Sequence, residues 1–120
     1  MSKCILVVED QKDNRQILRD LLTNAGFEMI EAENGEDAVA SAQARRPDLI
    51  LMDIQLPVLD GYEATRRIKA HPDLKSIPII VVTSYALSGD EDKARLAGCD
   101  DYVAKPFSPR QLLAKIKEHV

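Results

Sequence analysis

The stretch DLILMDIQLPVLDGYE, residues 48–63, places an apolar run directly before a carboxylate, Asp53. The run LILM has the near-continuous hydrophobicity of a strand that is buried on both faces of a parallel sheet. Pro57 and Gly61 then break the pattern. Because strands often stop at a polar residue, one such ending means little. What Asp53 signifies depends on how the other strands end.

Four further segments have strand character: CILVV (4–8), FEMIEA (27–32), IPIIVV (77–82) and DYVA (101–104). Helical periodicity lies between them, most clearly at Ile17, Leu18, Leu21, Leu22 and Ala25. The resulting order, βαβαβαβαβα, predicts a three-layer α/β sandwich with right-handed crossovers. Five strands and five helices suit the flavodoxin-like (βα)5 fold, whose parallel sheet has the order 2-1-3-4-5. That strand order follows from the fold class and not from the periodicity.

Each predicted helix begins with a capping residue that is followed three positions later by an acid or amide. The pairs are Asp13 with Gln16, Asn34 with Asp37, Asp60 with Glu63, Ser88 with Glu91, and Ser108 with Gln111. Pro109 suits the first position of the last helix. Helix ends are predicted at Gly26 and Gly98, and before Pro47 and Pro72.

The composition bounds the size and the partners of the protein. A chain of 120 residues with 45% hydrophobic content forms one core, so we expect residues 1–120 to be a single domain without an output domain. The 16 basic and 20 acidic residues give a net charge of -4, which argues against nucleic acid and anionic membranes as partners. Proteins or small ions are the expected partners.

The cysteines and histidines show no metal-ligand spacing. We expect Cys4 and Cys99 to be reduced, buried thiols rather than a zinc site or a disulfide. We expect His71 and His119 to be solvated residues near helix ends. The apolar run after Met1 is too short for a signal peptide, and no run approaches a membrane span, so the predicted location is cytoplasmic.

Four strands of the predicted sheet end in polar side chains: Glu9 with Asp10, then Asp53, Thr83 and Lys105. Each has an ordinary structural explanation alone, but the carboxyl ends of parallel strands meet at one edge, where ligands of such sheets bind. Clustered carboxylates suit Mg²⁺, and a lysine and a hydroxyl can contact a phosphoryl group. The set therefore favours phosphoryl chemistry, in which a carboxylate can be the nucleophile.

Four stretches carry a family resemblance: VVED (7–10), LILMDIQLPVLDGYE (49–63), VVTS (81–84) and YVAKPF (102–107). In this order they resemble the motifs of the CheY-like receiver domains of two-component response regulators. The resemblance covers essentially the whole chain and is closest to stand-alone regulators of the DivK type. It implies a cytoplasmic signalling protein and not an enzyme.

The resemblance assigns roles to residues at the predicted edge. Asp53 would accept a phosphoryl group from a phosphohistidine on a histidine kinase or histidine phosphotransferase. Asp10 and Asp53 would bind Mg²⁺ directly, Glu9 would act through water, and the backbone carbonyl of Gln55 would complete the ligands. Lys105 would pair with the acidic cluster and then with the phosphoryl group.

The resemblance also implies a switch. Thr83 would move to bond the phosphoryl oxygen while Tyr102 rotates inward, and the Lys105–Pro106 bond would be cis. Gln55 and Tyr85 would tune dephosphorylation by controlling the access of water. The surface formed by the fourth helix, fifth strand and fifth helix would contact a downstream protein target. Its possible contact residues are Leu87, Lys93, Tyr102 and Lys115.

Several alternatives stay open at this point. The chain could be a monomer or a weak dimer, a phosphorelay shuttle, or a receiver fragment of a larger hybrid kinase. An aspartyl-phosphate phosphatase of the haloacid dehalogenase type is disfavoured, since those enzymes place Asp-x-Asp after the first strand. A flavodoxin-like carrier or inert scaffold would leave the edge carboxylates unexplained.

Overall fold

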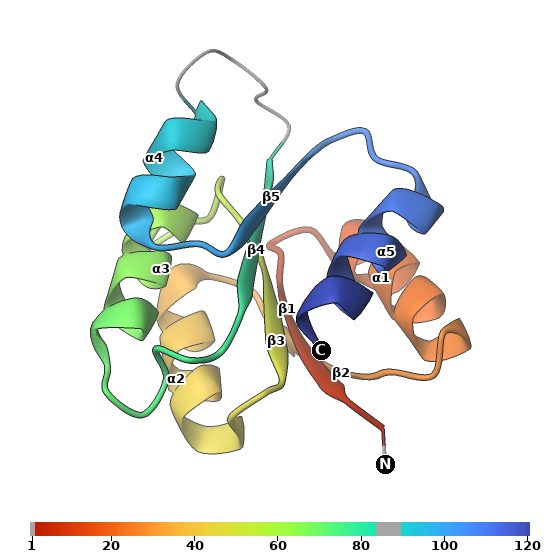
Figure 1. Ribbon diagram of the computed structural model, residues 1–120, viewed down its shortest axis with the longest axis horizontal. Helices are drawn as coiled ribbons and strands as arrows, with labels where there is room; N and C mark the ends of the chain where they lie inside the picture. The colour runs from red at the N-terminus through yellow and green to blue at the C-terminus, as the bar shows by residue number, and fades with distance from the viewer. Residues whose placement is uncertain (1, 84–89) are drawn as a thin grey trace.

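The computed structural model describes residues 2–83 and 90–120 (Figure 1). Five parallel strands form one sheet with the order β2-β1-β3-β4-β5, as predicted. The strands are β1 (Cys4–Val8), β2 (Glu28–Ala32), β3 (Leu49–Asp53), β4 (Ile79–Thr83) and β5 (Asp101–Ala104). The helices are α1 (Lys12–Asn24), α2 (Gly35–Arg45), α3 (Gly61–Ala70), α4 (Asp90–Ala97) and α5 (Pro109–His119).

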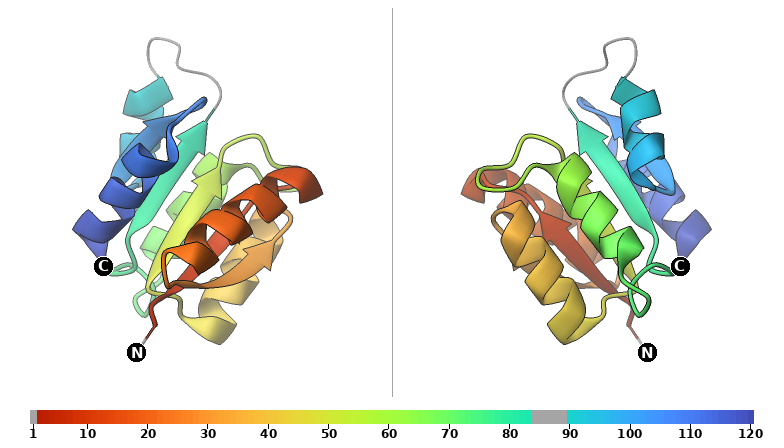
Figure 2. Two further views of the ribbon diagram at one scale, coloured as in Figure 1. Left: turned by 90° about the vertical axis from the view of Figure 1, so that its right-hand side faces the viewer. Right: turned by 90° about the vertical axis from the view of Figure 1, so that its left-hand side faces the viewer.

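The sheet is covered on both faces, which confirms the prediction from the continuous apolar strands. Figure 2 shows α1 and α5 on one face and α2, α3 and α4 on the other. Within β3, Ile50 and Met52 belong to the core cluster beneath α2, α3 and α4, whereas Leu49 and Leu51 belong to the cluster beneath α1 and α5. Every residue of β3 is buried, because alternating side chains enter two separate cores.

Three of the predicted capping pairs are present. The side chains of Asn34, Asp60 and Ser108 accept hydrogen bonds from the backbone N–H three residues later. Pro109 is the first residue of α5, where its missing N–H removes no helical hydrogen bond. The pair of Ser88 with Glu91 involves residues outside the described part of the chain. Local sequence therefore sets these three helix starts.

The predicted cap at Asp13 is wrong. Helix α1 already begins at Lys12, and its N-cap Gln11 makes no side-chain capping bond. The Glu9 carboxylate accepts the Gln11 N–H at 3.0 Å instead, and the Arg15 guanidinium donates to the Glu9 carbonyl at 2.9 Å. These contacts fix the entry into the helix two residues before Asp13, so the N-cap is Gln11.

Two kinds of glycine shape the connections. Gly26 and Gly98 end α1 and α4 as predicted, with φ of 90° and 105°, values that other residues rarely adopt. Gly61 instead allows a close approach, because a Cβ at this position would overlap the carbonyl oxygen of Asp53. Helix α3 can therefore start directly against the end of β3.

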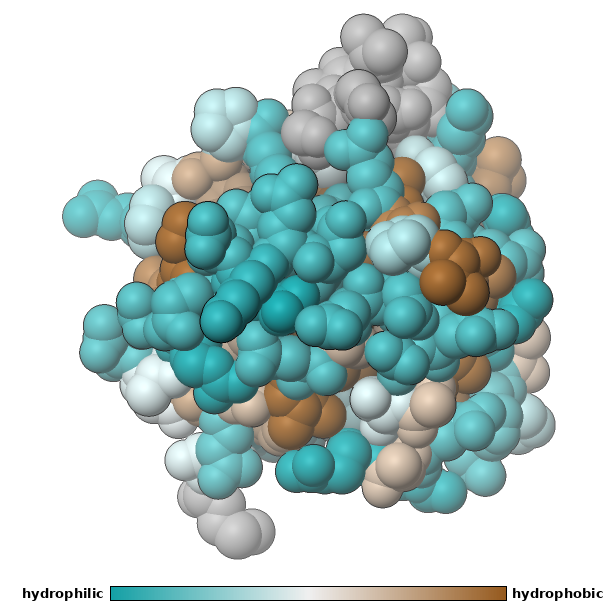
Figure 3. Space-filling model, turned by 180° about the vertical axis from the view of Figure 1, so that it is seen from behind, coloured by the Kyte–Doolittle hydropathy of each residue, from teal (hydrophilic) through white to brown (hydrophobic). Residues whose placement is uncertain are grey.

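The surface seen in Figure 3 is mostly hydrophilic, and its hydrophobic spots are separate rather than one continuous patch. Among residues 2–83 and 90–120, no helix has both the length and the apolar character needed to cross a membrane.

Both cysteines are free, although Cys4 is only partly buried. Burial raises the pKa of Cys99 to about 11, so its thiol stays protonated at neutral pH.

Candidate functional site

The register of the sheet brings the predicted polar residues together at the carboxyl ends of the strands, which form the edge named in the sequence analysis. Val8 on β1 pairs with Met52 on β3. Glu9 follows the first of these residues and Asp53 the second, so both carboxylates leave the sheet at the same level. Lys105 directly follows the last residue of β5. Residues far apart in sequence therefore meet because parallel strands end together.

Lys105 joins the two buried carboxylates. Its Nζ lies 3.2 Å from Glu9 Oε1 and 3.3 Å from Asp53 Oδ2. Glu9 is 3% exposed and Asp53 is 8% exposed, so water screens these charges only weakly. Removing the lysine would leave two like charges close together in a poorly hydrated place.

Each carboxylate is also oriented by a backbone N–H. Gln11 donates to Glu9 Oε2 at 3.0 Å, and Gln55 donates to Asp53 Oδ1 at 3.1 Å. In each carboxylate, the backbone N–H donates to the oxygen that Lys105 does not contact. The carboxylates are thus held in fixed directions before any ligand binds.

The pKa values show an excess of negative charge. Burial raises the pKa of Asp53, Lys105 opposes the rise and Glu9 adds to it, with a result of about 6. Burial alone would raise the pKa of Glu9 as well. The Gln11 hydrogen bond and the Lys105 charge outweigh burial, so the Glu9 pKa is lowered. Burial and the nearby Glu9 raise the pKa of Asp10. When all three carboxylates are ionised, Lys105 leaves an excess of two negative charges, which one divalent cation would neutralise.

The donor set fits Mg²⁺. Carboxylate oxygens of Glu9, Asp10 and Asp53 lie within 4.8 Å of one another. They line a cavity of about 390 Å³ together with Gln11, Asn14, Gln55 and Lys105. Oxygen ligands beside an open, water-accessible space suit Mg²⁺, which keeps several waters and binds one or two carboxylates.

The remaining predicted residues lie near this edge or outside the described chain. Thr83 is buried at the carboxyl end of β4, and Tyr102 is partly buried on β5 beside the core beneath α2, α3 and α4. The predicted cis bond between Lys105 and Pro106 is present. Tyr85 and Leu87 lie outside the described residues.

Sequence analysis missed Asn14. Its Nδ2 donates to Glu9 Oε1 at 3.4 Å, and its side chain lines the same cavity as Asp10 and Gln55. The available signal was its position in the first turn of the helix that follows the first strand, because Asn14 is the third residue of α1. A polar side chain in that turn lies close to the carboxyl end of the strand.

The expectation that His119 is solvated is wrong. Its Nε2 lies 3.1 Å from Asp101 Oδ2, and its side chain is 24% exposed. Lys115 Nζ lies 3.0 Å from the other oxygen, Asp101 Oδ1. Burial raises the pKa of Asp101, but the Tyr102 N–H, Lys115 and His119 together hold it below its ordinary value. Lys115, predicted as a partner contact, is thus engaged within the molecule.

The family of the chain is shown by direct comparison. The sequence pattern of the response regulator receiver domain matches residues 5–117. The chain belongs to the response regulator receiver domain family, and its fold and acidic edge agree with this assignment.

Relatives and solved structures support the same conclusion. The chain is 42% identical to the polar-differentiation response regulator DivK of Brucella anthropi, over 100% of this chain and 98% of DivK. It is 40% identical to the receiver domain of the sensor histidine kinase PA1611 from Pseudomonas aeruginosa, with a TM-score of 0.92 and coverage of 99% and 98%. That structure holds a magnesium ion in the active-site cleft. Chemotaxis protein CheY4 of Vibrio cholerae is 28% identical, with a TM-score of 0.93 over 100% of both chains.

Proposed function

We propose that Asp53 accepts a phosphoryl group from a phosphohistidine on a histidine kinase or histidine phosphotransferase, with Mg²⁺ bound beside it. The observation that carries this proposal is the position of the Asp53 carboxylate. Its Oδ2 lies 3.3 Å from Lys105 Nζ, and carboxylate oxygens of Asp53, Glu9 and Asp10 lie within 4.8 Å of one another. A nucleophile, a cation and a metal-binding oxygen set are thus adjacent, as phosphoryl transfer requires.

The transfer is a displacement at phosphorus. A carboxylate oxygen of Asp53 forms the new O–P bond while the N–P bond to the donor imidazole breaks, and the imidazole leaves with the electron pair of that bond. With a pKa of about 6, Asp53 is mostly ionised at neutral pH, and the ionised form is the nucleophilic one. Lys105 neutralises charge on the phosphoryl oxygens. Asp10, Asp53 and the Gln55 carbonyl would hold Mg²⁺, with Glu9 acting through water, and the ion would supply further charge neutralisation.

The switch in this proposal runs through β4 and β5. Val82 on β4 pairs with Asp53, and the next residue, Thr83, pairs with Ala104 on β5. A movement of Thr83 toward a phosphoryl group on Asp53 would shift its partner strand β5 and so displace Tyr102, which is two residues before Ala104. We propose that this change alters the face formed by α4, β5 and α5, where a downstream protein binds. Lys93 is exposed on that face and is a candidate contact.

The biological setting is proposed on the same basis. The 42% identity with DivK supports a regulator that acts through protein contacts in the cytoplasm rather than as an enzyme with its own substrate. A receiver unit of a hybrid sensor kinase is a second candidate, favoured by the 40% identity to the PA1611 receiver. An immunoblot of the native protein distinguishes them, because a hybrid kinase is several times longer.

The proposal is tested by the intact mass of the protein after incubation with acetyl phosphate and Mg²⁺. We expect one labile phosphoryl adduct that requires Mg²⁺ and is absent from Asp53→Asn. The control variant is Asp101→Asn, which removes another carboxylate that a lysine contacts, and it should still form the adduct. If acetyl phosphate gives none, a histidine phosphotransferase phosphorylated on its histidine replaces it as donor. An adduct retained in Asp53→Asn, or none from either donor, would contradict the proposal.

A further inference from the structure

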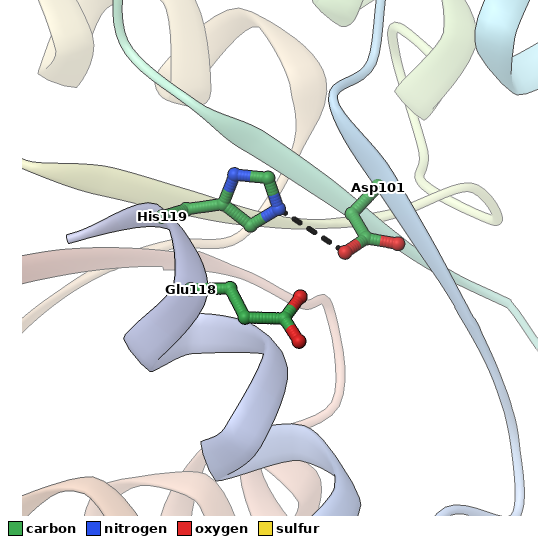
Figure 4. A group of neighbouring side chains, drawn as sticks. All are labelled: Asp101, Glu118 and His119. Atoms are coloured by element: carbon green, nitrogen blue, oxygen red, sulfur yellow. Dashed lines mark hydrogen bonds and ion pairs between the residues drawn. The ribbon is translucent and has the colours of Figure 1, made fainter.

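A second group of metal-ligand side chains lies at the opposite edge of the sheet from Asp53. Asp101 is the first residue of β5, while Glu118 and His119 come from the last turn of α5 (Figure 4). Their ligand atoms lie within 4.8 Å of one another. The set combines an imidazole nitrogen with two carboxylates, unlike the all-oxygen set beside Asp53.

The Asp101 carboxylate is held in position by groups that are not ligands. Its Oδ1 accepts the Tyr102 N–H at 2.8 Å and a hydrogen bond from Lys115 Nζ at 3.0 Å. Its Oδ2 is directed toward the His119 ring. Hydrogen bonds to the non-ligating oxygen are the usual means of orienting a metal-binding carboxylate.

The spacing of the Asp101 and His119 donor atoms suits a single ion. Two ligands at about 2.1 Å from one Zn²⁺ are separated by roughly 3.4 Å at a tetrahedral angle. Asp101 Oδ2 and His119 Nε2 are 3.1 Å apart, so a small outward movement of either side chain would admit an ion between them. Glu118 is exposed, so its side chain is free to turn toward the Asp101 and His119 donor atoms. Figure 4 shows its carboxylate on the side of α5 that faces Asp101.

The surroundings favour a cation. His119 is the last residue of α5, and the carboxyl end of a helix carries a partial negative charge. Counted together, Asp101, Glu118 and Lys115 carry one net negative charge when His119 is neutral. An imidazole ligand selects borderline metals such as Zn²⁺, Co²⁺ or Ni²⁺ over Mg²⁺ and Ca²⁺.

We propose that Asp101, Glu118 and His119 form a second metal site, specific for divalent transition metals of the Zn²⁺ class. A bound ion would join the end of α5 to the start of β5. That junction lies directly beside Tyr102 on the face proposed to contact the downstream protein. The site itself does not depend on phosphorylation of Asp53.

The test is a titration of the ¹⁵N-labelled full chain with Co²⁺ in the presence of excess Mg²⁺, followed by amide NMR signals. Paramagnetic Co²⁺ broadens signals near its site, so we expect losses at residues 101, 102, 118 and 119. Zn²⁺ should compete with Co²⁺ and restore these signals. Asp53→Asn should give the same result, which separates this site from the proposed phosphoryl site.

Two variants and one control complete the test. His119→Ala should weaken Co²⁺ binding at residue 101 at least about tenfold, and Glu118→Gln should weaken it to a smaller degree. Glu118 is exposed, so its substitution leaves the core intact. His71→Ala removes the only other histidine of the chain and should change nothing. Broadening confined to residues 9, 10 and 53, or unchanged binding in His119→Ala, would overturn the proposal.

Discussion

Two aspartates at opposite edges of the sheet have similar partners and opposite pKa shifts. Asp53 accepts the Gln55 N–H and lies 3.3 Å from a lysine, Lys105. Asp101 accepts the Tyr102 N–H and lies 3.0 Å from a lysine, Lys115. The pKa of Asp53 is raised to about 6, whereas the pKa of Asp101 is lowered.

Burial is the largest influence on both pKa values and raises each, so the opposite outcomes come from how far the neighbouring groups offset it. Asp53 shares its one lysine with the buried Glu9 and lies close to Asp10. Asp101 has both Lys115 and His119 as partners, on separate oxygens. The same pair of residue types therefore gives an acidic cluster with an excess of negative charge in one place and a carboxylate with two basic partners in the other. Burial and local charge balance, not residue type, decide the direction of each pKa shift.

The largest expected effect is a difference between two single variants, in which either Lys105 or Lys115 is replaced by methionine. Lys105→Met should slow phosphorylation by acetyl phosphate on the order of 100-fold, because it removes the cation beside the phosphoryl oxygens. Lys115→Met should leave the rate near that of the wild type, since Lys115 lies at the other edge of the sheet. The rates are measured by intact mass over time at saturating Mg²⁺. Equal rates in the two variants would mean that the lysines do not differ in role.

The second prediction concerns the free energy of unfolding of Asp53→Asn. Because the folded-state pKa of Asp53 is raised, its contribution to stability is full below the unfolded pKa and is lost as pH rises through about 6. At pH 7.5 without Mg²⁺ the charged form therefore destabilises the fold. Asp53→Asn should stabilise the protein by about 2 kcal/mol, as measured by urea unfolding in EDTA.

Asp101→Asn is the matched variant and should have the opposite sign. The folded-state pKa of Asp101 is lowered, so its contribution is present above the unfolded pKa and is lost as pH falls through the folded value. At pH 7.5 the substitution should destabilise the protein by about 1 kcal/mol. If both variants shifted stability in the same direction, charge balance would not explain the two sites.

The last prediction concerns the pH dependence of Mg²⁺ binding. Protons and Mg²⁺ compete for Asp53, whose pKa without metal is about 6. The affinity should fall about tenfold for each pH unit below that value and should level off above neutral pH. Calorimetric titrations across this range measure it, and Asp53→Asn should bind weakly with a flatter profile. A wild-type affinity that is constant from acidic to neutral pH would contradict a raised pKa.

The amino-acid sequence by itself determined the alternation of strands and helices, three of the helix caps, and the polar endings of four strands. These features are local, because they depend on periodicity and on residues three or four positions apart. Together with the family motifs, they were enough to place Glu9, Asp53 and Lys105 at one edge. The family motifs also implied that Lys105 would pair with the acidic cluster, but they gave no information on the direction of the pKa shifts there.

Only the tertiary structure decided the rest. It placed Lys105 between two buried carboxylates, and it replaced the expected Asp13 cap by contacts from Glu9. It also joined His119 to Asp101, residues 18 positions apart on different elements, where the sequence had suggested a solvated histidine. The physical reason is that pKa shifts and ion pairs depend on distance and burial in space, which are set by packing against the sheet and not by local sequence.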